Sequence, residues 1–173
     1  HKADKLEEAE KIYQAILHIH PMHAAALSNL GVMLYKLDRL DEAELIYKKL
    51  IAQKPDNAET HSNLGVIQQK LNKFDEAEAS CKKAIELNSD YVVAHNNLSN
   101  TLKKLGKLDE AESSYRTTIA LKPDYVEAHY NLSIMLQELD RLSEAEESCK
   151  KDIEINPNYS GAYNNLGITL QKI

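Results

Sequence analysis

A fixed period of 34 residues constrains this chain more than any other feature of its sequence. The tripeptide Glu-Ala-Glu recurs at that step without insertions, starting at Glu8, Glu42, Glu76, Glu110 and Glu144. The dipeptide Asn-Leu keeps the same step, starting at Asn29, Asn63, Asn97, Asn131 and Asn165. A period this strict indicates that one supersecondary unit is repeated along the chain.

Each period contains two stripes of apolar residues at helical spacing. In the stretch 126–159 the first stripe comprises Ala128, Leu132, Leu136 and Leu139, and the second comprises Leu142, Ala145, Cys149, Ile153 and Ile155. Steps of three and four residues predict two amphipathic helices, here named helix A and helix B, which a short turn makes antiparallel. Only 5 Gly and 4 Pro occur in 173 residues, which favours helix throughout. We expect an all-α protein.

The boundaries of the helices also follow the period. Residues that tolerate a left-handed backbone separate helix A from helix B, namely Asp38, Asn72, Gly106 and Asp140. Capping boxes are predicted at the start of helix B, from Asp41 with Glu44, Asp75 with Glu78, Asp109 with Glu112 and Ser143 with Glu146. Proline ends helix B, and the residue after it is predicted to cap the next helix A, at Asp56, Asp90, Asp124 and Asn158.

Stacked hairpins are the expected architecture, because a single hairpin leaves apolar faces exposed. We expect a right-handed α-solenoid, a superhelix of antiparallel helix-turn-helix repeats with a concave inner surface. The chain is predicted to be a single array, 1–173, with full repeats at 24–57, 58–91, 92–125 and 126–159. A helix B in 1–23 precedes them and a helix A in 160–173 follows.

Two positions depart from the expected pattern. The last helix presents Leu166, Leu170 and Ile173 without a following helix, which predicts a fragment of a longer array or end-to-end self-association. Asp152 occupies a position that other units fill with small or apolar residues, so that contact is either weaker than the others or faces solvent.

Several classes of function are disfavoured by composition. The net charge is -6 and acidic and basic residues alternate, so no basic stripe is available for nucleic acid. Apolar runs fall short of the roughly 18 residues that span a bilayer, so we expect no membrane partner and a cytoplasmic location. The two cysteines, Cys81 and Cys149, are expected to be reduced and to pack in the core.

Neither a metal site nor an active site is expected. His18, His20 and His23 lie close in sequence, but a structural zinc ion needs four ligands and no cysteine is near them. The sequence has no glycine-rich phosphate loop, zinc-protease motif or serine nucleophile motif. We therefore predict no catalytic residues, no cofactor and no enzymatic activity.

The repeated residues resemble those of the tetratricopeptide repeat family over the whole chain. The resemblance is carried in one unit by His129, Asn131, Leu132, Ser133, Asp140, Glu144, Ala145, Cys149 and Pro157. It implies that helix A lines a concave groove that receives an extended peptide or a helix of a partner protein. A narrower resemblance, to the superhelical arm of O-linked N-acetylglucosamine transferases, is carried by His61, His95 and His129, each two residues before an asparagine.

The predicted groove is polar and mainly uncharged. An asparagine amide offers both a donor and an acceptor, so it can bond the backbone of an extended peptide without reading its sequence. The alternative interpretation is that these amides bridge neighbouring helices as framework. The predicted partner-binding residues are Asn29, Tyr35, Asn63, Val66, Asn96, Asn97, Asn100, Lys103, Tyr130, Asn131, Ile134 and Asn165.

Three hypotheses of function follow. The leading one is a protein-interaction scaffold that holds a partner protein or peptide in the groove. The second is the substrate-selecting arm of a larger enzyme, such as a glycosyltransferase. The third is a structural repeat that self-assembles through its ends.

Overall fold

The computed structural model describes residues 2–173, with side chains from residue 5 onward. This part of the chain forms ten α-helices and no strand, which confirms the predicted all-α class. The helices are α1 (Lys2–Ile19), α2 (Ala24–Lys36), α3 (Leu40–Gln53), α4 (Ala58–Lys70), α5 (Phe74–Leu87), α6 (Val92–Lys104), α7 (Leu108–Leu121), α8 (Val126–Glu138), α9 (Leu142–Ile155) and α10 (Ser160–Lys172). Even-numbered helices are helices A and odd-numbered ones are helices B.

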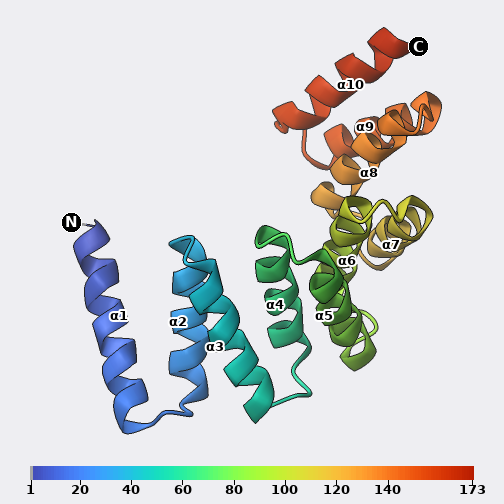
Figure 1. Ribbon diagram of the computed structural model, residues 1–173. Coiled ribbons are helices and arrows are strands. Elements are labelled where there is room, and N and C mark those ends of the chain that lie inside the picture. The colour runs from blue at the N-terminus through green and yellow to red at the C-terminus, as the bar shows by residue number, and fades with distance from the viewer. Residues whose placement is uncertain (1) are drawn as a thin grey trace. The chain divides into compact units, whose positions relative to one another are not determined.

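Two compact units divide the chain within α6, His1–Ala94 and His95–Ile173. In the first unit each of α1 to α4 packs against the next helix in sequence (Figure 1). In the second unit α7 to α9 do the same, and α10 also contacts α8, so consecutive helices A touch there. The single array remains a prediction, and His1 of its first range, 1–23, lies outside the described residues.

The turn from helix A to helix B has the predicted left-handed conformation. The backbone angle φ is 61° at Asp38, 59° at Asn72 and Asp140, and 74° at Gly106. This conformation lets the next residue turn back toward helix A. The N–H of Arg39, for example, donates to the carbonyl of Leu34 at 2.9 Å. Unpaired carbonyls at the end of helix A are satisfied in this way, which stops the helix at the same place in each period.

The predicted caps are corrected by the structure. Helices B begin two residues earlier than expected, so Arg39, Lys73, Lys107 and Arg141 are the N-cap residues, and none makes a side-chain cap bond. The predicted capping boxes are therefore wrong. The predicted caps Asp56, Asp124 and Asn158 are also wrong, because the N-cap residue of helix A is one residue later. At that position the Oδ1 of Asn57 accepts from the Thr60 N–H at 2.8 Å.

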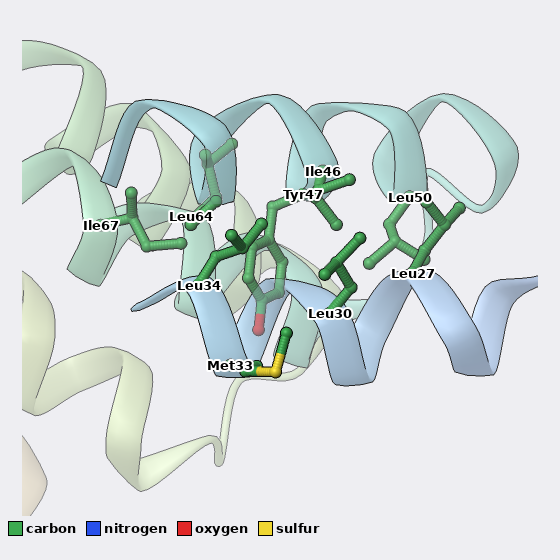
Figure 2. Packing of buried hydrophobic residues seen from close by; sticks show 10 residues of the cluster. Leu27, Leu30, Met33, Leu34, Ile46, Tyr47, Leu50, Leu64 and Ile67 are labelled. Carbon is green, nitrogen blue, oxygen red and sulfur yellow. The ribbon is translucent and has the colours of Figure 1, made fainter. Parts of the chain in front are cut away.

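Close packing between helix A and helix B builds the core. In the first unit Leu27, Leu30 and Leu34 of α2 meet Ile46, Tyr47 and Leu50 of α3 (Figure 2). Fully burying one such side chain stabilises the fold by about 1.5 to 3 kcal/mol. Gly31 permits the approach, since a Cβ there would lie 2.8 Å from Cε2 of the Tyr47 ring.

Core positions of the second unit are filled in the same way, with one exception. Both cysteines are buried in the core, as predicted, Cys81 in α5 of the first unit and Cys149 in α9 of the second. Asp152 of α9 is also 0 % exposed, and neither carboxylate oxygen has a hydrogen-bond partner among the described residues. Burial raises the pKa of Asp152 to about 7. The alternative in which Asp152 faces solvent is therefore wrong.

Candidate interaction surface

In the first unit, four predicted partner-binding residues lie on α2 and α4. The side chain of Asn29 is exposed, and those of Tyr35, Asn63 and Val66 are half-buried. Lys70 of α4 places its Nζ 4.7 Å from the centre of the Tyr35 ring, so a cation–π contact links the two helices. We call these four residues the first strip.

A small pocket lies beside the first strip. It has a volume of about 250 Å³ and is lined by residues from α2, α3 and α4, including Ser28, Tyr47 and Asn63. Burial, and then the charge of Glu59, raise the pKa of the Tyr47 phenol, which hydrogen-bonds with Asn63. The phenol therefore stays protonated at neutral pH. The pocket is lined by three amide side chains, three hydroxyl groups, the acidic Glu59 and the basic Lys54.

The second unit brings five further predicted residues together on α6 and α8. Asn100 and Lys103 come from α6, and Tyr130, Asn131 and Ile134 come from α8; all five are half-buried. We call them the second strip.

Two hydrogen bonds tie the helices of the second strip to each other and to α7. The Nδ2 of Asn131 donates to Oδ1 of Asn100 at 3.1 Å, and the hydroxyl of Tyr115 donates to the same oxygen at 2.5 Å. The amide oxygen of Asn100 is thus used by the fold.

Charge and aromatic contacts complete the second strip. The Nζ of Lys103 lies 3.0 Å from Oε1 of Glu138, so its charge is paired across α6 and α8. The ring of Tyr130 packs against Tyr159 with centroids 5.2 Å apart and planes tilted by 59°. Gly161 makes room for both rings, because a Cβ there would lie within about 3 Å of each. The surface is therefore aromatic and amide-rich, and it carries little net charge.

Three predicted partner-binding residues are interior. Asn96 is 1 % exposed, Asn165 5 % and Asn97 9 %. Asn165 donates from Nδ2 to Oγ of Ser133 at 3.3 Å, and its backbone carbonyl accepts from Nε2 of Gln137 at 2.9 Å. These contacts join α8 to α10, as the framework interpretation requires. A partner cannot reach these side chains, so the accessible residues of the predicted set are those of the two strips.

An ion-pair pattern between helices B was missed by the sequence reasoning. The second glutamate of a Glu-Ala-Glu motif pairs with the basic N-cap residue of the next helix B, 29 positions later. Arg39 Nη1 lies 2.7 Å from Oε2 of Glu10, and Lys73 Nζ lies 2.7 Å from Oε2 of Glu44. The constant spacing of glutamate and basic residue was the available signal, and the capping-box interpretation of the same glutamates obscured it.

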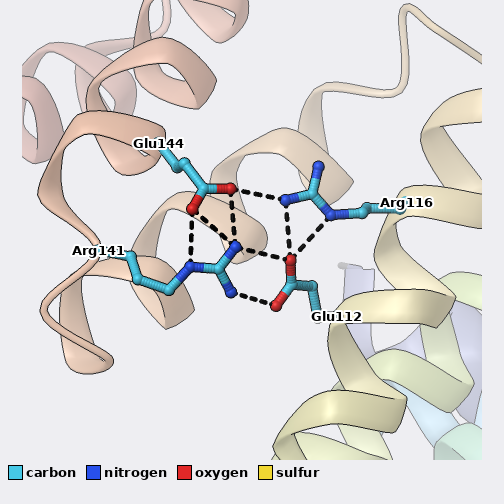
Figure 3. Close-up of polar contacts among 4 residues, drawn as sticks. All are labelled: Glu112, Arg116, Arg141 and Glu144. Carbon is cyan, nitrogen blue, oxygen red and sulfur yellow. Dashed lines mark hydrogen bonds and ion pairs between the residues drawn. The ribbon is translucent and has the colours of Figure 1, made fainter.

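The most extensive of these networks lies in the second unit (Figure 3). Arg141 donates to both Glu112 and Glu144, and Arg116 donates to Glu144 at 2.8 Å. Hydrogen bonds from Arg141 hold the pKa of Glu112 below its usual range, and those to Glu112 and then Glu144 raise the pKa of Arg141. The carboxylates therefore stay ionised, and the network holds α9 against α7.

Other kinds of site find no support within the described residues. No group of three or more His, Cys, Asp and Glu side chains there could hold a metal ion. The rings of His61 and His129 instead contact the backbone carbonyls of Pro55 and Pro123, at 2.9 and 3.0 Å. None of the described helices combines the length and the apolar character needed to cross a membrane.

Family models identify the repeat. Models described as tetratricopeptide repeat match residues 1–67, 58–91, 80–113 and 126–159, and one described as TPR repeat matches 100–140. The chain belongs to the tetratricopeptide repeat family. Membership in this family, abbreviated TPR, supports a role as a protein-interaction scaffold.

Solved structures share the TPR solenoid fold. The match to MamA has a sequence identity of 23 % and a TM-score of 0.83, and it covers 92 % of this chain and 93 % of the MamA chain. YrrB is described as a TPR protein with an unusual peptide-binding site. Its match has a sequence identity of 24 % and a TM-score of 0.76, and it covers 94 % of this chain and 84 % of the YrrB chain. The match to TTC0263, a thermophilic TPR protein of Thermus thermophilus, has a sequence identity of 22 % and a TM-score of 0.77. It covers 98 % of this chain and 93 % of the TTC0263 chain. These identities establish the fold alone.

Curated proteins give no match to this TPR chain. The narrower resemblance to the arm of O-linked N-acetylglucosamine transferases therefore stays a prediction.

Proposed function

We propose that this TPR chain is a scaffold that holds an extended segment of a partner protein against its helices A. The observation that carries the proposal is the second strip, where Tyr130, Asn131 and Ile134 are half-exposed on one helix beside Asn100. Amide groups bond a peptide backbone whatever its sequence, and the aromatic and aliphatic side chains provide apolar anchors. The proposed partner is protein or peptide, and a cytoplasmic location stays a prediction.

Energetics indicate that the amides need these anchors. Each net hydrogen bond contributes about 0.5 to 1.5 kcal/mol, so two bonds from the accessible amides of one strip give about 1 to 3 kcal/mol. Association costs about 4 to 15 kcal/mol. Val66 and Ile134 are already half-buried, so covering the rest of either side chain adds only about 1 kcal/mol, roughly half the value for full burial. Useful affinity therefore requires further contacts on the same strip, from apolar side chains of the bound segment that pack on its aromatic and aliphatic residues.

The first strip supports the same function by different means. Its pocket of about 250 Å³ has room for one side chain of a bound segment, next to the amide of Asn63. Amide and hydroxyl groups line the pocket, and Glu59 and Lys54 carry opposite charges, so the pocket favours an uncharged polar side chain that both donates and accepts hydrogen bonds. The peptide-binding site in the description of YrrB, which has this fold, is consistent with such a use of the helices.

Selection from a displayed library of random peptides tests the proposal without knowledge of the partner. The wild-type chain is expected to enrich peptides with spaced apolar residues. Val66→Glu and Ile134→Glu each place a charge on one strip. Each change is expected to lower the affinity for the peptides that bind that strip at least tenfold. Leu45→Glu is the matched control, because Leu45 is an exposed residue of helix B outside both strips.

Circular dichroism of each variant shows whether the helices remain. The proposal fails if folded Val66→Glu and Ile134→Glu variants bind the enriched peptides as tightly as the Leu45→Glu control.

A further inference from the structure

A cavity of about 610 Å³ lies among α7, α8 and α9, three helices that have further helices before and after them in the chain. Its floor is apolar, because Leu132 and Leu136 of α8 line it and are only 3 % and 1 % exposed. Tyr130 and Ile134 of the second strip lie two positions from these leucines, which is about 200° around a helix of about 3.6 residues per turn. The cavity therefore lies on the face of α8 opposite the second strip.

The cavity exists because α9 carries a small side chain where α3 carries a large one. Ser148 of α9 has the same position in the 34-residue period as Ile46 of α3. Ile46 is 8 % exposed and packs within the cluster formed by α2 and α3 (Figure 2). A serine side chain is too short to fill the equivalent space above Leu132 and Leu136.

The hydroxyl of Ser148 has no hydrogen-bond partner among the described residues, unlike that of the corresponding serine in α5. There Ser80 donates from Oγ to Oε1 of Gln68 at 2.7 Å. In the second unit Leu136 takes the position of Gln68, and a leucine side chain has no oxygen to accept that bond. The cavity thus offers a ligand one half-exposed hydroxyl group beside its apolar floor.

One carboxylate at the cavity also lacks a basic partner. Lys151 lies 2.8 Å from Glu154, which leaves the exposed Glu147 without an ion pair among the described residues. Glu147 and Glu154 are both within one helical turn of Lys151, so one ammonium group serves two carboxylates on this wall. The other charged residues that line the cavity are paired, Arg116 with Glu144 and Lys150 with Glu146. The cavity therefore has an unmatched negative charge.

An ion pair joins the two walls of the cavity. Arg116 of α7 donates to Glu144 of α9 at 2.8 Å, and Arg141 also donates to Glu144 (Figure 3). These charge-assisted hydrogen bonds hold α9 against α7 in the chain without a ligand. A site whose walls are already positioned loses less entropy on binding than one that must be ordered by its ligand.

We infer that this cavity binds a basic side chain of a partner protein, together with an apolar neighbour of that side chain. The stem of an arginine or lysine lies on Leu132 and Leu136, and its charged end meets Glu147 and the hydroxyl of Ser148. The pocket of about 250 Å³ beside the first strip has room for one side chain, so a cavity of about 610 Å³ has room for two. This second binding surface does not rest on the proposed function.

Selection from a displayed library of random hexapeptides tests the inference on the full chain. The chain carries Ile134→Glu, so that the second strip is blocked. Peptides that bind this chain, but not one that also carries Ser148→Ile, are expected to contain arginine or lysine next to an apolar residue. Isoleucine is the residue of α3 at this position, so Ser148→Ile should fill the cavity and weaken binding at least tenfold.

Two results of the selection would overturn the inference. One is that no peptide distinguishes the two chains while both remain helical by circular dichroism. The other is that the distinguishing peptides lack basic residues. If Ser148→Ile itself disturbs the fold, the exposed Glu147 provides a test that leaves the core intact.

Removing the charge from either side measures the ion pair. An enriched peptide is compared with the same peptide carrying citrulline for arginine or acetyl-lysine for lysine, which keeps the stem. That change and Glu147→Gln are each expected to weaken binding about two- to fivefold, and together no more than either alone. Glu86→Gln, which removes an exposed carboxylate of α5, is the matched control and should bind like the wild type. Equal affinity of Glu147→Gln and Glu86→Gln would overturn the inference.

Methyl NMR of the full chain locates the bound peptide. The methyl signals of Leu132 and Leu136 are expected to shift when the peptide is added, whereas those of Leu27 and Leu64 in the first unit should not. Shifts of the first two residues on raising the protein concentration without peptide would identify a second copy of the chain as the occupant. That result would also overturn the inference.

Discussion

Replacing Asp152 by Asn is expected to stabilise the second unit, and the gain depends on pH. Asp152 is fully buried in α9, and its two oxygens have no hydrogen-bond partner in the described part of the chain. Its pKa is about 7 in the folded chain, against 3.8 for an ordinary aspartate. The difference of about 3 pH units corresponds to about 4 kcal/mol, at about 1.36 kcal/mol for each unit.

The sign follows from which state takes up the proton. Below about pH 4 the carboxyl is neutral in both folded and unfolded chains, so its raised pKa carries no penalty. As the pH rises from about 4 to 7 the unfolded chain ionises first, and the free energy of unfolding falls by up to about 4 kcal/mol. Asn keeps the shape without the charge, so the stability of Asp152→Asn should exceed that of the wild type at pH 8 and match it near pH 4.

Other groups near Asp152 do not produce this difference. Burial raises the pKa of the Cys149 thiol, with smaller contributions from Asp152 and Glu146, so the thiol does not ionise between pH 4 and 8. Burial likewise raises the pKa of the Tyr159 phenol. Every other titratable group is common to the two proteins, so its contribution largely cancels when they are compared.

Urea denaturation followed by circular dichroism, at pH 4 and pH 8, measures the effect. Because repeat arrays need not unfold in one step, hydrogen exchange of the α9 and α10 amides should show where the gain lies. Thr118→Asp is the matched counterpart, since Thr118 is a buried residue at the same position of α7 and this change should introduce the same loss above pH 4. Equal urea midpoints for Asp152→Asn and wild type at pH 8 would refute the reasoning.

Three further predictions concern the packing and turns of the repeat. Gly31→Ala should lower the free energy of unfolding, measured by urea denaturation, by about 1 to 3 kcal/mol, because its Cβ meets the Tyr47 ring. Gly167→Ala should leave that free energy unchanged or raise it by up to about 1 kcal/mol, because a Cβ there meets no described atom within 4 Å. Gly106→Ala should cost about 1 to 2 kcal/mol because φ is 74° there, and an unchanged melting temperature would contradict this. Arg141→Gln should destabilise the second unit at low salt and less so at 1 M NaCl, as thermal melts at the two salt concentrations would show.

The candidate surface was only partly predictable. Five asparagines share one position of the 34-residue period, and local sequence does not distinguish them. In the structure Asn29 is exposed, whereas Asn97 and Asn165 are buried. Asn131 lies between these extremes, bonded to Asn100 of the neighbouring helix A. Accessibility depends on which side chains the adjacent helices place over each amide, and that is a property of packing.

The glutamates at the start of helix B show the same limit. The capping-box motif predicts that Glu44 and Glu112 bond to the backbone at the start of their own helices, because an acidic residue lies three positions before each of them. The structure pairs them with Lys73 and Arg141 instead, 29 residues later. Each glutamate therefore bonds to a basic side chain and not to a backbone N–H of its own helix, because a charge-assisted hydrogen bond is the stronger of the two.

The 34-residue register, the two helices in each period and the left-handed turns between them were all predictable from the sequence alone. These features depend on backbone preferences and on spacing over a few residues, which any stretch of chain carries with it. Tertiary packing is what leaves some amides accessible, pairs particular carboxylates, and buries Asp152 without a hydrogen-bond partner for its carboxylate among the described residues. Those outcomes depend on the desolvation and contacts that neighbouring helices impose, so residues at identical positions of the repeat come to differ.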